Sequence, residues 1–240
     1  MEADYRADLA HIHASGFGDL AATAGPVLAG LLKDAGIDDG LVVDLGCGNG
    51  VTSRALSDAG YDVLGIDRSA AMLAFARRTA PGARFRRGSF LDGDLPPCRA
   101  VAAVGEVLNY TRRSLDPIFR RVHRALEPGG LFVFDLAGPG RVAGRGSARY
   151  WTEGEDWAIL VEVEEDRGRG LLTRRMTTFR RSGRGWRRDA ETHQQRLHRA
   201  GDVARRLRAL GFRVRIRRGY AGERFAPGHF VVAARAEPKR

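Results

Sequence analysis

The chain has 240 residues, 43% hydrophobic and 29% charged, which suffices for one large α/β domain or two small ones. No run of about 18 apolar residues occurs, so the sequence excludes a transmembrane helix. The first twenty residues lack a basic segment followed by an apolar one, and Cys47 and Cys98 are the only cysteines. We therefore expect no signal peptide and no disulfide framework, and we expect a cytoplasmic protein.

The charge of the chain is uneven. The formal net charge is +11, and 38 of the 40 basic residues are arginine. Residues 1–100 hold 10 basic and 13 acidic residues, whereas residues 101–240 hold 30 basic and 16 acidic residues. A basic C-terminal half can attract a phosphate-bearing substrate or nucleic acid. A GC-rich bacterial genome and a solvated arginine-rich surface explain the same bias, so charge alone decides nothing.

Hydrophobic periodicity and turn residues predict alternating helices and strands along most of the chain. We expect a helix over 18–36 that Pro26 interrupts or restarts, and a helix over 70–80 that Ser69 caps. The other expected helices cover 51–59, 115–126 and 201–210, and the expected strands cover 41–45, 61–66, 83–88, 100–104, 131–136, 212–220 and 228–236. This alternation predicts right-handed crossovers and a parallel sheet covered on both faces.

The pattern changes after Gly138. Residues 138–151 are typical of a turn-rich loop. Residues 157–166, 171–181 and 186–198 then alternate apolar and polar side chains between glycine turns, which predicts an antiparallel β-meander. We therefore expect 146–198 to be an insertion in an α/β domain made of 37–145 and 199–240.

The stretch LVVDLGCGNG, residues 41–50, ends a buried strand with glycines at alternate positions. Parallel sheets bind ligands beyond the carboxyl ends of their strands, where glycine lets backbone N–H groups approach the ligand. The dinucleotide fingerprint fails at Val51, and no Gly-Lys-Ser/Thr follows as in a P-loop. Asp44 is a poor neighbour for a diphosphate but a good one for an ammonium group.

The segment VVDLGCGNG resembles motif I of the class I S-adenosylmethionine-dependent methyltransferases. LGIDRSAAML, RRGSFLDGDLP and LEPGGLFVFDL resemble the later motifs of this family, in order and at its usual spacing. The resemblance covers roughly residues 38–136 and extends more loosely to the C-terminal strands. It implies an α/β fold: a Rossmann-like, doubly wound, mostly parallel seven-stranded sheet with an antiparallel last strand, plus the inserted meander. It also implies S-adenosyl-L-methionine as the cofactor and S-adenosyl-L-homocysteine as its product.

The resemblance also implies cofactor-binding residues. Asp67 would accept hydrogen bonds from the two ribose hydroxyls, and Asp44 would bind the amino-acid end of the cofactor. Ser89 and Phe90 would border the adenine, although the family often has an acid where Ser89 stands. The remaining expected contacts are Gly46, Cys47, Gly48, Gly50, Arg68, Met72, Gly105, Glu106 and Phe17. We interpret Cys47 as a small packing residue and not as a nucleophile.

Candidates for the acceptor side come from three segments. Residues 1–36 would form an N-terminal helical lid, as in relatives. The polar or aromatic candidates are Tyr5, His11, His13 and Phe17 in the lid, Glu106, Asn109 and Tyr110 after the fourth strand, and Glu191 and His193 on one face of the meander. The catalytic candidates among them are His193, Glu106, Tyr110 and His13, with His193 or Glu106 as a base if the acceptor starts protonated. We expect no metal site.

The sequence therefore predicts methyl transfer to N or O of a small molecule, mainly by in-line positioning. The insertion resembles in position the substrate-binding sheet of sugar-nucleotide N-methyltransferases and glycine N-methyltransferase-like enzymes. Its arginines would suit an acidic or phosphate-bearing acceptor.

Three alternatives stay open. The first is an RNA or protein methyltransferase that docks through the basic half. The chain lacks a Pro-Cys pair and an Asn-Pro-Pro-Tyr-like sequence after the fourth strand, which makes nucleic acid the weaker acceptor. The others are a non-catalytic cofactor-binding module and a site for a different nucleotide. A monomer and a homodimer are both compatible with the sequence, and no membrane partner is expected.

Overall fold

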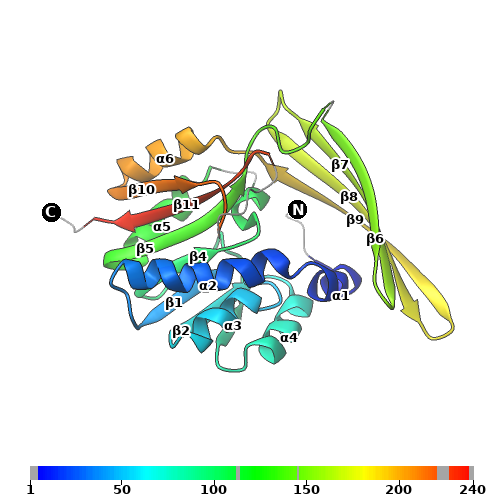
Figure 1. Ribbon diagram of the computed structural model, residues 1–240, viewed down its shortest axis with the longest axis horizontal. Coiled ribbons are helices and arrows are strands. Elements are labelled where there is room, and N and C mark those ends of the chain that lie inside the picture. The colour runs from blue at the N-terminus through cyan, green and yellow to red at the C-terminus, as the bar shows by residue number, and fades with distance from the viewer. Residues whose placement is uncertain (1–4, 112–113, 145, 221–226, 238–240) are drawn as a thin grey trace.

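Two β-sheets organise the molecule (Figure 1). The computed structural model describes residues 5–111, 114–144, 146–220 and 227–237. The seven-stranded sheet has the order β10-β11-β5-β4-β1-β2-β3 and the four-stranded sheet has the order β6-β7-β8-β9. The strands are β1 Leu41–Leu45, β2 Asp62–Asp67, β3 Arg84–Arg87, β4 Cys98–Ala103, β5 Leu126–Ala137, β6 Ser147–Glu153, β7 Trp157–Asp166, β8 Leu171–Ser182, β9 Gly185–Arg196, β10 Phe212–Arg217 and β11 His229–Ala236.

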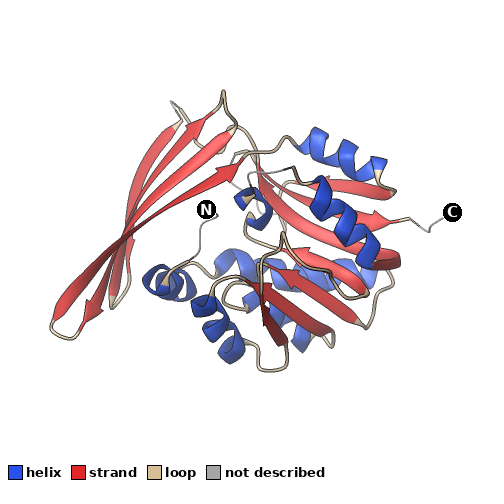
Figure 2. Ribbon diagram, turned by 180° about the vertical axis from the view of Figure 1, so that it is seen from behind, coloured by secondary structure: helices blue, strands red, loops and turns tan. Residues whose placement is uncertain are grey.

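Most of the helices lie against the larger sheet, and the first helix lies between the two sheets (Figure 2). They are α1 Ala7–Gly16, α2 Asp19–Asp34, α3 Val51–Asp58, α4 Ala70–Thr79, α5 Asp116–Ala125 and α6 Ala200–Ala209, with a 3₁₀ turn, η1, over Val107–Tyr110. Ser69 caps α4 as expected, because its Oγ accepts from the backbone N–H of Met72 at 3.2 Å. No helix in the described ranges combines the length and the apolar character that a membrane crossing requires.

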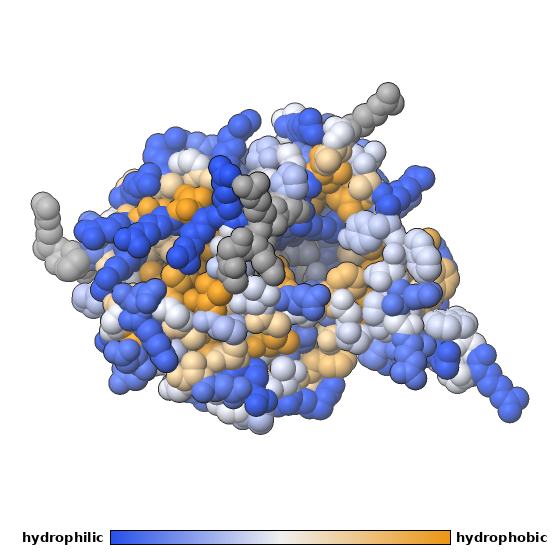
Figure 3. Space-filling view, viewed as in Figure 1, coloured by the Kyte–Doolittle hydropathy of each residue, from blue (hydrophilic) through white to orange (hydrophobic). Residues whose placement is uncertain are grey.

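The strand directions confirm the expected fold. The neighbours β3, β2, β1, β4 and β5 run parallel, whereas β11 is antiparallel to both β5 and β10. Successive strand residues point to opposite faces, so Val42 belongs to the same buried cluster as Leu28 of α2, whereas Val43 belongs to that of Phe119 of α5. The sheet is therefore buried on both sides, as its apolar strands require. On the face seen in Figure 3, hydrophobic side chains form separate patches among hydrophilic ones.

The four-stranded sheet is antiparallel throughout and packs against α1. Its inner face presents Trp157, Ile159 and Val161, which share a buried cluster with Leu9 and Ile12 of α1. The other side of α1 contacts α4 of the larger sheet, so α1 bridges the two sheets (Figure 1).

Three local expectations were wrong. Pro26 neither interrupts nor restarts α2, which runs unbroken from Asp19 to Asp34. The apolar face of this helix is buried, and the missing N–H removes only one helical hydrogen bond. β6 lies where we expected a loop; its side chains are nearly all exposed, so it shows no apolar alternation and its backbone pairing with β7 holds it. β5 begins at Leu126, through the expected EPGG turn, with a register shift opposite Cys98 and Ala100.

Candidate functional site

A cavity of about 1040 Å³, including its part open to solvent, lies at the carboxyl ends of the central strands. It runs between the loops after β1, β2, β3 and β4 and the N-terminal segment. Fourteen residues expected from the sequence line it: Asp44, Gly46, Cys47, Gly48, Asp67, Arg68, Met72, Ser89, Phe90, Gly105, Tyr5, Phe17, His13 and Tyr110. Gly50, Glu106 and His193 do not line it.

The three glycines after β1 serve different purposes. A Cβ on Gly46 would lie 2.5 Å from the side chain of Val107, and a Cβ on Gly50 would lie 2.9 Å from the backbone of Ala76. These two glycines permit close packing within the protein. Gly48 has a φ of +52° and faces open space in the cavity wall. It is therefore the glycine at which a ligand approaches the backbone.

Asp67, at the end of β2, ties the cavity wall together. Its Oδ2 accepts from the backbone N–H of Gly48 at 2.9 Å, and its Oδ1 accepts from the backbone N–H of Ser69 at 2.8 Å. The carboxylate thereby fixes the glycine loop and the start of α4 while it lines the cavity.

Asp44, at the end of β1, is 1% exposed, and its Oδ2 accepts from Ser53 Oγ at 2.6 Å. Burial raises the pKa of Asp44 from 3.8 to about 7, and the charge of Asp67 adds to the rise. A cation placed in the cavity would offset this cost. The two carboxylates therefore form a wall suited to a ligand with a positively charged end.

Several lining residues were missed from the sequence. They are Leu20, Ala21, Asn49, Thr52, Ile66, Ser69, Gly88, Val104 and Val107. Asn49 precedes the N-cap of α3, Gly50, and Thr52 is the second residue of that helix. Their place at a helix N-terminus, at the end of the glycine loop, was the available clue. The others are apolar, or are ordinary turn and cap residues, which carry no chemical pattern of their own.

The end of the cavity under α1 is aromatic. Tyr5, His13, Phe17 and Tyr110 line it, with the rings of His13 and Phe17 stacked at 6.2 Å between centroids. Burial lowers the pKa of His13 from 6.5 to about 4, so its ring is neutral at physiological pH. Its Nδ1 is buried without a hydrogen-bond partner in the structure.

His193 lies behind this end of the cavity and is 2% exposed. Its Nδ1 is 3.5 Å from Tyr110 Oη, and its Nε2 is 3.0 Å from Glu191 Oε2. Glu191 and His193 thus share one face of β9, as the sequence indicated. His193 reaches the cavity through Tyr110.

Glu106 is held away from the cavity by positive charges. Its Oε1 is 2.9 Å from Arg141 Nε, and its Oε2 is 3.1 Å from Arg174 Nη2 and 3.2 Å from Gln195 Nε2. Burial alone would raise the pKa of Glu106, but Arg174 and Arg141 outweigh it and hold the pKa at about 2. A carboxylate fixed in this way is a poor base, so the structure favours other groups.

Two further candidates are engaged elsewhere. Asn109 is fully buried; its side chain donates to the carbonyl of Ala137 and accepts from the backbone N–H of the same residue. His11 is 3.1 Å from Asp156 Oδ1 and does not line the cavity. Asn109 therefore fastens η1 to β5, and His11 fastens α1 to the small sheet.

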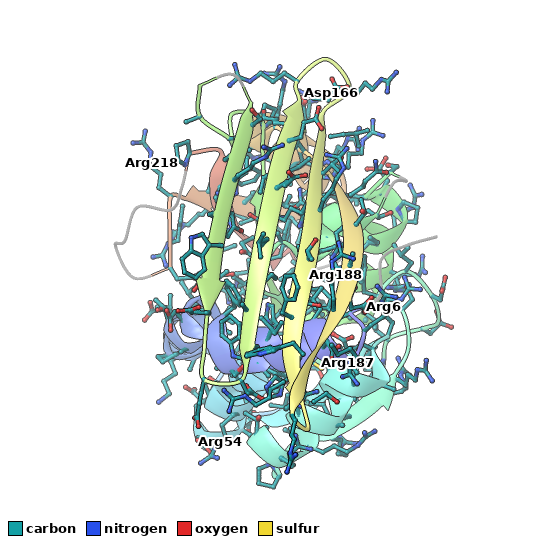
Figure 4. The ribbon with its side chains drawn as sticks, turned by 90° about the vertical axis from the view of Figure 1, so that its right-hand side faces the viewer. Arg6, Arg54, Asp166, Arg187, Arg188 and Arg218 are labelled. Atoms are coloured by element: carbon teal, nitrogen blue, oxygen red, sulfur yellow. The ribbon has the colours of Figure 1, made fainter. Side chains whose placement is uncertain are left out.

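The arginines of the inserted strands are spread over both faces of the small sheet. In Figure 4, which looks onto its outer face, Asp166 lies at the turn after β7, and Arg187 and Arg188 lie along β9. Their ion pairs are Arg149 with Glu162, Arg167 with Glu165, Arg169 with Asp166, Arg174 with Glu106, Arg175 with Glu164, and Arg180 and Arg187 with Asp8. Arg68 is the arginine that lines the cavity among the described residues.

Known proteins share this architecture. A family model described as a methyltransferase domain matches residues 42–130. The methyltransferase-named protein YqeM of Bacillus subtilis is 27% identical over 188 residues, which cover 74% of this chain and 75% of YqeM.

Two solved structures extend the similarity to nearly the whole chain. An S-adenosylmethionine-dependent methyltransferase from Clostridium acetobutylicum aligns with a TM-score of 0.81 at 18% identity, over 95% of this chain and 98% of that one. CalS10 from Micromonospora echinaspora, an amino pentose methyltransferase solved with S-adenosylmethionine bound, aligns with a TM-score of 0.73 at 21% identity, over 95% of each chain. The fold is thus common to all three chains.

Proposed function

Because this chain belongs to the class I S-adenosylmethionine-dependent methyltransferases, we propose that it methylates a nitrogen or oxygen atom of a small molecule. The observation that carries the proposal is the cavity itself. It joins a glycine loop that is open at Gly48, the carboxylates of Asp44 and Asp67, and an aromatic end that holds the unpartnered Nδ1 of His13.

The residues present suit the cofactor. Asp67 would accept from the ribose hydroxyls, the carboxylate of Asp44 would face the ammonium group, and Gly48 leaves room for the ligand beside its backbone. Phe90 and Met72 would pack on the adenine, with Ser89 beside them. The bound cofactor supplies a methyl group that its positive sulfur already activates.

The protein's part in the reaction is to hold the acceptor atom in line and to exclude water. Orientation of this kind lowers a barrier by about 7–11 kcal/mol. The aromatic end offers the neutral ring of His13 and the hydroxyls of Tyr5 and Tyr110 as hydrogen-bonding groups. Such groups position an amine or a hydroxyl, and α1 with the small sheet shields them from solvent.

The acceptor we favour is small and need not be acidic. Several arginines of the small sheet that could attract a phosphate are paired with acids of the protein, as Arg174 is with Glu106. Their spread over both faces of the sheet gives little support to docking of RNA or of another protein. The amino-sugar acceptor in the name of CalS10 agrees with an amine acceptor.

The test is to follow label from cofactor carrying a deuterated methyl group. The purified protein is incubated with fractions of a cell extract, and mass spectrometry finds the labelled products. We expect label in small metabolites, none of it with Gly48→Arg. Label confined to RNA or protein, or no transfer at all, would overturn the proposal.

A further inference from the structure

We propose that Glu191 and His193 form a proton outlet that acts on the acceptor through Tyr110, and that the acceptor therefore carries a proton on its reacting atom. The proposal rests on the methyltransferase function proposed above. In it, Tyr110 touches the acceptor, whereas His193 and Glu191 are positioning residues.

The hydrogen bonds of this chain of groups have one direction. The carboxylate of Glu191 only accepts, so the proton of the His193 ring lies on Nε2, 3.0 Å from Glu191 Oε2. The Nδ1 atom of His193 is then unprotonated and accepts from Tyr110 Oη at 3.5 Å. Since Tyr110 donates to His193, its oxygen accepts from Tyr5 Oη at 3.2 Å. Every donor points away from the cavity and toward Glu191.

Only the cavity end of this chain of groups meets the ligand space. Tyr5 and Tyr110 line the cavity, whereas His193 and the side chain of Glu191 are nearly fully buried behind them. The groups come from the N-terminal segment, from η1 after β4 and from β9. The inserted sheet thereby contributes to the chemistry as well as to the cavity wall.

The surrounding charges suit transient charge separation. Burial raises the pKa of Tyr110 and of Tyr5, and the guanidinium of Arg174, on β8 opposite His193, opposes this rise at both phenols. Glu106 holds Arg174 in place. At the far end, the backbone N–H of Arg6 donates to Glu191 Oε1 at 3.2 Å.

The step balances as follows. The proton on the acceptor nitrogen or oxygen passes to Tyr110 Oη, while the phenol proton passes to His193 Nδ1. The lone pair kept by the acceptor forms the bond to the methyl carbon, and the pair of the broken carbon–sulfur bond stays on sulfur. The imidazolium then lies against the carboxylate of Glu191 until it returns its proton to solvent. An ammonium or a hydroxyl needs this outlet, whereas a carboxylate acceptor has no proton to lose.

The first experiment needs no acceptor. Nitrogen-15 NMR of histidine-labelled protein reports the ring tautomer of His193, whose signals are assigned by their loss in His193→Gln. We expect the Nε2–H tautomer in the wild type, and loss of its protected, carboxylate-bound ring proton in Glu191→Gln. Glu164→Gln, which changes an exposed carboxylate on the outer face of the same sheet, leaves that signal unchanged. The Nδ1–H tautomer in the wild type would overturn the outlet.

The second experiment uses the acceptor that the labelling screen identifies. General acid–base assistance is worth about 10²–10⁴-fold, so we expect kcat to fall by about a hundredfold at neutral pH in Tyr110→Phe, His193→Gln and Glu191→Gln. The loss should shrink as rising pH deprotonates the acceptor, and affinity for S-adenosylhomocysteine should stay within about twofold. If Glu191→Gln transfers methyl groups with the kcat and the pH profile of the wild type, the proton outlet is overturned and the proposed function stands. Absence of transfer in the wild type would overturn the outlet together with the proposed function.

Discussion

The backbone N–H of Gly48 donates to the carboxylate of Asp67 at 2.9 Å, so the residue that ends β2 holds the loop that follows β1. The two strands are parallel neighbours, which brings their carboxyl ends to one edge of the sheet. The same carboxylate caps the turn before α4 through the N–H of Ser69. Asp67 thus shapes the cavity as well as lining it.

We predict that Asp67→Ala weakens the binding of S-adenosylhomocysteine roughly a hundredfold, because it removes about 3 kcal/mol of charged hydrogen bonds to the ribose. Isothermal titration calorimetry measures the loss. The matched control is Asp62→Ala, at the other end of β2, which removes only an exposed ion pair with Arg84. Equal affinities in the wild type and Asp67→Ala would remove Asp67 from the ribose role.

Gly48→Arg should abolish cofactor binding and leave the fold intact, because the added side chain would enter the cavity. Gly183→Arg is the matched control: Gly183 has a φ of +60° and faces open space in the turn between β8 and β9. Both variants carry a similar backbone strain, and only one of them blocks the cavity. Circular dichroism and calorimetry on the pair separate the two effects. Similar losses of affinity in both would show that strain, and not occupancy, is responsible.

The sequence predicted what local chemistry dictates. The apolar strands, the Ser69 cap and the acid at the end of β2 follow from residue type and spacing. β6 escaped prediction because an exposed edge strand is held by backbone pairing and needs no apolar pattern. The ion pairs of Glu106 could not be predicted from the sequence either, because its partners Arg141 and Arg174 lie far from it along the chain. Contacts across such distances depend on packing, which spacing does not encode.

A third prediction concerns how α1 is held. Asp8 accepts from Arg187 of β9 at 2.7 Å through its Oδ2 and lies 3.5 Å from Arg180 of β8. These guanidinium groups, Arg187 above all, hold the pKa of Asp8 below its ordinary value of 3.8, so the attraction is fully present at neutral pH and is lost only in strong acid. Solvent screens the exposed guanidinium of Arg187, so the pair restrains α1 only moderately.

We therefore expect Asp8→Asn to speed the release of S-adenosylhomocysteine about fivefold, with faster hydrogen exchange in α1. Stopped-flow displacement and exchange mass spectrometry report the two effects. Asp58→Asn, which breaks the exposed pair with Arg54 on α3, should change neither. Unchanged release from Asp8→Asn would mean that α1 does not control the exit of the cofactor.

The last prediction follows from the protonation of Asp44. Burial and the nearby charge of Asp67 raise its pKa in the folded protein from 3.8 to about 7. The folded state therefore holds a proton that the unfolded chain releases, and stability without ligand falls as pH rises from about 4 through about 7. The cofactor's ammonium group favours the ionised carboxylate, so binding should release this proton.

We expect affinity for S-adenosylhomocysteine to drop about tenfold for each pH unit below the pKa of Asp44 and to level off above it. Calorimetry in two buffers of different ionisation enthalpy counts the proton directly, one unit below and one unit above that pKa. Asp44→Asn should bind more weakly at high pH and lose this pH dependence, because the amide has no proton to release. If the wild type releases no proton on binding below the pKa of Asp44, the ammonium group lies away from Asp44. If Asp44→Asn keeps the pH dependence of the affinity, that dependence belongs to another titratable group.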